Sequence, residues 1–137
     1  MTALGGMEVE NRGINFEDRI KNADEDTFAL YTLIKEHLLS YQGIKNRLSI
    51  RCDSYRCCRR LIAKMAIGGS SLKIFLPREV MEEEQYSQIK IRFRDLSDTS
   101  AYEDTPAMVP VKSVVGARKI CKIIDIFMER NEIKKSK

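Results

Sequence analysis

An alternation of apolar and cationic side chains in residues 44–52 constrains the fold more than any other feature of the sequence. The apolar positions are Ile44, Leu48, Ile50 and Cys52, and the positions between them include Lys45, Arg47, Ser49 and Arg51. Successive side chains of a strand point to opposite faces, so this pattern predicts a strand with one apolar face and one cationic face. The rest of the chain must therefore supply a core for the apolar face.

Further strands are predicted on both sides of a glycine-rich turn. Asp53-Ser54-Tyr55 predicts a bend, and residues 57–67 predict a second strand with one apolar parity. Gly68-Gly69-Ser70-Ser71 is typical of a hairpin connection, because glycine adopts positive φ without steric cost. Residues 72–76 then alternate again and predict a third strand.

Residues 88–94 repeat the opening alternation. We expect Ile89, Ile91 and Phe93 to face the core, and Lys90, Arg92 and Arg94 to face outward. A fifth short strand is predicted near residues 107–111. Pro106 and Pro110 place it at a sheet edge, because proline cannot donate a hydrogen bond to a neighbouring strand.

Helical patterns precede and follow these strands. Residues 16–20 predict a short helix, and Asp24 with its acidic neighbours caps a longer helix that ends near Ser40. Ser113 is the predicted cap of a closing helix over residues 114–132. This order predicts the α+β class: a four- to five-stranded antiparallel sheet, with N-terminal helices and a C-terminal helix packed on one face.

A length of 137 residues suits a single domain. We expect a disordered leader in residues 1–14, one α+β domain in residues 15–133 and a frayed basic tail in residues 134–137. Met7 is a second start residue, so residues 1–6 are left out of the fold. The N-terminus lacks the pattern of a secretory signal, and no apolar run approaches the roughly 20 residues of a membrane helix. These features predict a cytosolic protein without membrane contact, and they leave the oligomeric state open.

The cysteine and histidine positions predict no active site. The four cysteines lack the paired C-x-x-C spacing of a zinc site. The Cys57-Cys58 pair is expected to straddle a strand, with at most one side chain buried. His37 is the single histidine and lies on a predicted helix, with no acidic or nucleophilic residue placed to assist it. We therefore predict no catalytic residue, metal or cofactor.

Positive charge is concentrated in one part of the chain. Residues 44–78 hold nine Lys and Arg residues and one acid, although the net charge of the whole chain is +4. If the apolar parities of the strands face the helices, the outward positions form one cationic sheet face. Its predicted members are Lys45, Arg47, Arg51, Arg60, Lys64, Lys73, Lys90, Arg92 and Arg94.

Such a face favours an anionic partner, because like charges on neighbouring strands destabilise a sheet. Nucleic acid bound through its phosphate backbone is the first candidate for the partner. An acidic protein surface or a second copy of the chain is the second, and an enzyme of unknown class is the third reading. A face that is only solvated is the alternative to all three, since long Lys and Arg stems also cover sheet surface.

Several short segments carry a resemblance to a known group of proteins. They are residues 37–49, Asp53-Ser54-Tyr55, Ala63-Lys64 and Val111-Lys112-Ser113. Together they resemble an uncharacterised family of small bacterial domains, similar in layout to the MmcQ/YjbR-like domains. The resemblance covers about residues 16–128 and implies an α+β fold and DNA binding, but no reaction. The chain departs from that family at Ile50 and Ser70, where an aromatic residue and a lysine are usual.

Overall fold

The computed structural model describes residues 16–68 and 71–136 and confirms the α+β class. The elements are α1 (Phe16–Lys21), α2 (Glu25–Leu39), β1 (Lys45–Leu48), β2 (Asp53–Cys57), β3 (Arg60–Gly68), β4 (Ser71–Leu76), α3 (Glu79–Glu82), η2 (Glu84–Tyr86), β5 (Arg94–Asp95), η3 (Ser100–Tyr102), β6 (Ala107–Val111) and α4 (Val114–Arg130). The six strands form one antiparallel sheet in the order β1-β2-β3-β4-β6-β5. The sheet thus has one strand more than the upper number predicted.

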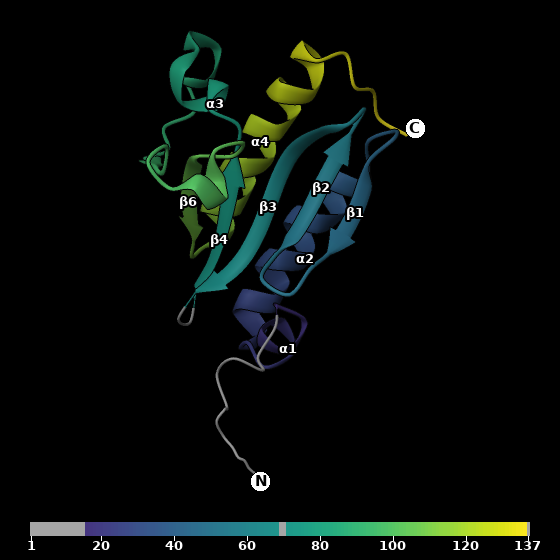
Figure 1. Ribbon diagram of the computed structural model, residues 1–137, viewed down its shortest axis with the longest axis vertical. Coiled ribbons are helices and arrows are strands. Elements are labelled where there is room, and N and C mark those ends of the chain that lie inside the picture. Colours follow the sequence, from purple (N-terminus) through teal and green to yellow (C-terminus); the bar gives the residue numbers. More distant parts are fainter. Residues whose placement is uncertain (1–15, 69–70, 137) are drawn as a thin grey trace, which may run out of the picture.

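The long helices pack together on one face of this sheet. Figure 1 views the molecule from the other face, with α2 and α4 behind the strands. Ile34 of α2, Ile74 of β4 and Ile120 of α4 are fully buried in one core between the layers. Burial of each such side chain contributes about 1.5–3 kcal/mol. We call the covered face of the sheet the inner face and the opposite face the outer face.

Both long helices begin where the sequence predicts. The Asp24 carboxylate accepts a hydrogen bond from the Thr27 backbone N–H at 2.7 Å, and this bond lowers the pKa of Asp24. Ser113 accepts from the Gly116 backbone N–H at 3.1 Å. Each bond satisfies one of the N–H groups that a helix start leaves without a partner. The caps therefore fix the starts of α2 and α4.

The first two strands meet at a different place from the predicted one. Asp53-Ser54-Tyr55 belongs to β2, and the bend occupies residues 49–52 instead. Ser49 closes this bend, because its backbone N–H donates to the Cys52 carbonyl at 2.9 Å and its hydroxyl contacts the same carbonyl. Ile50, expected in the core, is 71% exposed at the tip of the bend.

The predicted strand at residues 88–94 is almost entirely unpaired. Only its last residue, Arg94, pairs in the sheet, together with Asp95. The alternation of burial is nevertheless present, since Ile89, Ile91 and Phe93 are half-buried against the core. The segment packs beside α4, where Lys119 donates to the Lys90 carbonyl at 3.1 Å. The Lys119 side chain thus donates the hydrogen bond that a paired strand would have given to the Lys90 carbonyl.

The C-terminal segment differs from the frayed tail that the sequence predicts. The Lys134 carbonyl accepts from the Gln42 N–H at 2.7 Å, and the Ser136 N–H donates to the Ser40 carbonyl at 2.8 Å. Residues 134–136 therefore lie along residues 40–42. The predicted leader in residues 1–14 lies outside the described residues, as do Gly69 and Ser70 of the predicted hairpin. Gly68 and Ser71 on either side of that hairpin pair with each other.

Candidate anion-binding face

The strand register brings residues from all six strands into one row on the outer face. Directly paired residues share a face, so the row can be followed from strand to strand. It consists of Arg47, Ser54, Lys64, Phe75, Met108 and Arg94. Neighbouring strands lie about 4.8 Å apart, so the row is about 24 Å long. Cations occupy both of its ends and one position near its middle.

Three further cations flank this row on the same face. Lys45 pairs with Arg56 across β1 and β2, and Lys73 alternates with the buried residues of β4. The outer-face cations are Lys45, Arg47, Arg56, Lys64, Lys73 and Arg94. Within the described residues, none of them lies within ion-pair distance of an acid, and no acid occupies an outer-face strand position.

Part of the outer face is covered by the segment that contains η3. The Tyr102 ring stacks on the Phe75 ring, with centroids 4.3 Å apart and an interplanar angle of 2°. Figure 1 shows this green segment over β4. Phe75 lies under this ring, and both Phe75 and its neighbour Met108 are buried. The expectation of a wholly open face therefore holds only for the half formed by β1, β2 and β3. The Lys64 ammonium lies at the boundary, 5.6 Å from the Tyr102 centroid.

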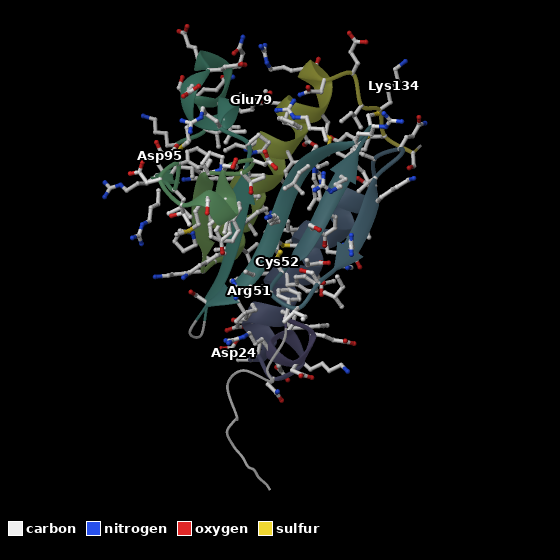
Figure 2. The ribbon with its side chains drawn as sticks, in the orientation of Figure 1. Asp24, Arg51, Cys52, Glu79, Asp95 and Lys134 are labelled. Atoms are coloured by element: carbon white, nitrogen blue, oxygen red, sulfur yellow. The ribbon has the colours of Figure 1, made fainter. Side chains whose placement is uncertain are left out.

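A shallow hollow of about 570 Å³ lies between the bend and η3. It is lined by Arg47, Leu48, Ser49, Ile50, Arg51, Cys52, Lys64, Ala101 and Tyr102. Figure 2 labels Arg51 and Cys52 in the bend that forms one wall. Three cations and no acid line this hollow, and its volume is within the usual range for small ligands. An anion in this hollow would therefore meet Arg47, Arg51 and Lys64 together.

The predicted site residues do not all reach this face. Lys45, Arg47, Lys64, Lys73 and Arg94 lie on it, and Arg51 lies at the rim of the hollow. Lys90 and Arg92 are exposed on the unpaired segment, where no strand pairing sets the direction of their side chains. Arg56 also lies on the outer face, although it is not among the predicted site residues. A bend at residues 53–55, as predicted, does not determine which face the following residue would occupy.

Arg60 lies on the inner side, contrary to the prediction. Tyr55 pairs with Ala63, but Arg56 pairs with Leu61, so Ile62 is an extra residue and β3 has a bulge. The bulge reverses the parity of the strand, and Arg60 then pairs with the buried Cys57.

The surroundings of Arg60 agree with this placement. Its guanidinium lies 4.9 Å from the Phe127 ring centroid, donates to Asn131 at 3.0 Å and forms an ion pair with Glu79. Figure 2 places Glu79 at the opposite end of the sheet from Arg51. Arg60 therefore joins β3 to α4 and to the start of α3, and it is not part of the outer face.

A buried carboxylate holds the first two strands against α2. Asp53 is completely buried on the inner face. One of its oxygens accepts from the Tyr31 hydroxyl at 2.8 Å and the Tyr55 hydroxyl at 2.5 Å, and the other accepts from the Asn46 amide at 2.6 Å. The Lys35 ammonium lies 3.4 Å away. Because Asn46 and Asp53 are chain neighbours of Arg47 and Ser54, this network fixes the outer-face row where it begins.

A second polar cluster joins α2 and α4 on the helical side. His37 Nε2 lies 2.7 Å from Asp125 Oδ1, and the Tyr41 hydroxyl donates to the same oxygen. The prediction that no acid assists His37 was therefore wrong, because Asp125 of α4 is distant from His37 in the sequence but adjacent to it in the fold.

Cys121 lies one turn before Asp125 on α4, but burial raises the pKa of its thiol to about 11. The thiol is protonated at neutral pH and is a poor nucleophile.

The described chain contains neither a cluster of three metal-binding side chains nor a helix that could span a membrane. Within residues 16–68 and 71–136, no three His, Cys, Asp or Glu side chains gather where they would hold a metal ion. None of the helices in those ranges combines the length and the apolar character needed to cross a bilayer. Comparisons of the chain with protein-family models, with curated proteins and with solved structures find no match.

Proposed function

We propose that this protein is a non-catalytic binding module that holds a polyanion, the phosphate backbone of a nucleic acid, against its outer face. The observation that carries the proposal is the segregation of charge on the sheet. Six cations occupy outer-face strand positions across five strands, without an acid among them in the described residues. Like charges this close repel one another, and bound phosphates remove the repulsion.

The dimensions of the face fit a phosphate backbone. Lys45 and Arg47 are two residues apart on β1, which separates their Cα atoms by about 6.7 Å. The open part of the row, from Arg47 on β1 to Lys64 on β3, is about 10 Å long and corresponds to roughly three base-pair steps of 3.4 Å. Phe75 is covered by Tyr102 and does not offer its ring to a base. Contacts with phosphates, which position a duplex without reading its sequence, fit this face better than base stacking.

The apolar residues beside the hollow favour a second candidate, an acidic protein segment. Leu48 and Ile50 are 47% and 71% exposed next to Arg47 and Arg51. A phosphate backbone offers nothing to apolar side chains, whereas a peptide with acidic and apolar residues contacts both kinds. The two candidates share the cations and differ in whether Ile50 contributes to binding.

Charge reversal on the outer face tests the first candidate. Arg47→Glu combined with Arg56→Glu should weaken binding of a fluorescent random-sequence 24-base-pair duplex by at least about tenfold at low salt. The matched control is Arg118→Glu combined with Lys122→Glu, which changes the same charge at exposed positions of α4. The control should bind more tightly than the outer-face variant.

Two results would reject the nucleic-acid proposal. The first is equal weakening in both double variants, which would show that only net charge matters. The second is undiminished binding by the Arg47 and Arg56 variant. If the wild-type protein ignores the duplex but binds an acidic peptide in a manner sensitive to Ile50→Ser, the second candidate replaces the first.

A further inference from the structure

Two adjacent cysteines sit at the turn between β2 and β3. Cys57 is the last residue of β2 and pairs with Arg60, so Cys58 and Arg59 form a two-residue hairpin loop. Their φ angles are +56° and +70°. Two positive φ angles are typical of a type I′ turn, in which Asn and Gly are usual. Left-handed backbone costs other residues about 1 kcal/mol or more, so this turn holds its cysteine at an energetic cost.

The turn brings the two sulfur atoms together. In an extended strand neighbouring side chains point to opposite faces, as the sequence predicted for this pair. Here the Cys57 and Cys58 Sγ atoms are 3.6 Å apart. Cys57 is buried and Cys58 is exposed, so one sulfur is anchored in the core and the other is open to solvent. The exposed Cys58 sulfur therefore has a second, buried sulfur next to it.

The separation of the sulfurs suits a bound ion better than a disulfide. Adjacent Cα atoms are about 3.8 Å apart, which is closer than the 4.4 Å minimum usual for a disulfide, so a bond between these sulfurs would be strained. Two thiolates on one ion, each at about 2.3 Å and at a tetrahedral angle, lie about 3.8 Å apart. The observed 3.6 Å is close to that value.

We propose that Cys57 and Cys58 form a two-thiol site for a thiophilic metal or metalloid ion. Soft thiolate ligands select such ions over magnesium or calcium. The Cys57 thiol donates to the Gln42 carbonyl oxygen, 3.8 Å from its Sγ atom. Solvent completes the coordination, because no group of three metal-binding side chains occurs in the described residues. The site is independent of the outer-face proposal and can fail without affecting it.

Phenylarsine oxide is a probe for paired thiols. Its arsenic forms two As–S bonds with Cys57 and Cys58, and the two thiol protons leave with the oxide oxygen as one water molecule. No electron is transferred in this exchange. The full chain should take up one probe molecule, as measured by intact mass. The second As–S bond is intramolecular, so glutathione should displace the probe at least about 100-fold less readily than from a single cysteine.

Variants separate this site from the other cysteines. Cys52→Ser combined with Cys121→Ser should retain the glutathione-resistant adduct, and Cys58→Ser, at an exposed position, should lose it. Uptake of one Cd²⁺ per chain that also disappears in the Cys58 variant would show that the site takes metal ions, whereas uptake of the arsenical alone would restrict it to metalloids. Ready displacement by glutathione from the wild-type protein, or a resistant adduct in Cys58→Ser, would overturn the proposal.

Discussion

Asp53 shows how a single residue can override its own sequence preference. Aspartate is depleted in strands, and Asp53 is the first residue of the segment that predicts a bend. Its carboxylate is nevertheless completely buried in β2, where the Tyr31, Tyr55 and Asn46 side chains donate to it. A buried charge is tolerated only with such partners. Those partners are distant in the chain or of unpredictable direction, so the sequence could not reveal this strand residue.

Loss of the Asp53 charge should weaken the fold. Asp53→Asn keeps the shape of the side chain but removes the charge from three short hydrogen bonds, and we expect the free energy of unfolding to fall by about 2–4 kcal/mol. Urea denaturation monitored by circular dichroism measures it. Asp98→Asn, at an exposed turn, is the control and should change stability by less than about 0.5 kcal/mol. Equal midpoints for the two variants would contradict the role given to the network.

Buried tyrosines make stability depend on alkaline pH. Burial is the largest cause that raises the pKa of Tyr31, Tyr41, Tyr55 and Tyr86, and only for Tyr86 is the value as low as about 12. Each group binds its proton more tightly in the folded state. Its contribution to stability is therefore complete below the unfolded pKa of about 10 and is lost as the pH rises towards the folded value.

Tyr86→Phe tests this dependence at one position. The Tyr86 hydroxyl is buried without a hydrogen-bond partner in the described residues, so its removal should cost little at pH 7. Above pH 10, stability of the variant should fall less steeply than that of the wild-type protein, by about 1.4 kcal/mol per pH unit. Urea midpoints measured from pH 7 to pH 11.5 give the slopes. Parallel profiles for the two proteins would show that this hydroxyl ionises equally in both states.

At the scale of elements, the helices could be predicted closely and the strands only in part. Caps and apolar spacing act within one helix, so Asp24 and Ser113 locate the starts of α2 and α4. A strand is defined by its partner as well as by its own pattern. Residues 88–94 therefore alternate between half-buried and exposed side chains, although only Arg94 pairs with another strand. The residues near Ile62 carry no sequence pattern that predicts the bulge.

The β2–β3 turn gives an element-scale prediction. Arg59→Gly removes the strain of a side chain at φ +70°, and part of this gain is offset by the greater freedom of glycine in the unfolded chain. We expect the free energy of unfolding to rise by about 0.5–1 kcal/mol. Arg118→Gly, at an exposed position inside α4, should instead lower it by about 1 kcal/mol. A lower thermal midpoint for Arg59→Gly would mean that Arg59 makes contacts that outweigh the strain.

At the scale of the whole molecule, the two faces of the sheet differ in both packing and charge. The inner face meets α2 and α4, and the outer face carries cations at its strand positions. Strand parity predicted five of these cations correctly, because Lys45, Arg47, Lys64, Lys73 and Arg94 follow the pleat. It misplaced Arg60 and missed Arg56, since one bulge and one displaced bend each change a parity. The segment around η3, which covers Phe75 on the outer face, has no alternation of apolar residues in the sequence, so its position could not be predicted.

The salt dependence of binding to a random-sequence duplex tests the outer face most directly. If the four outer-face cations of β1, β2 and β3 (Lys45, Arg47, Arg56 and Lys64) replace counterions on phosphates, a plot of log affinity against log salt should have a slope of about −4, and Arg47→Glu with Arg56→Glu should make it shallower by about 2. Fluorescence anisotropy from about 50 to 200 mM salt gives both slopes. A slope near zero in the wild-type protein, or the absence of binding at the lowest salt concentration, would contradict the assignment of this face to a phosphate backbone.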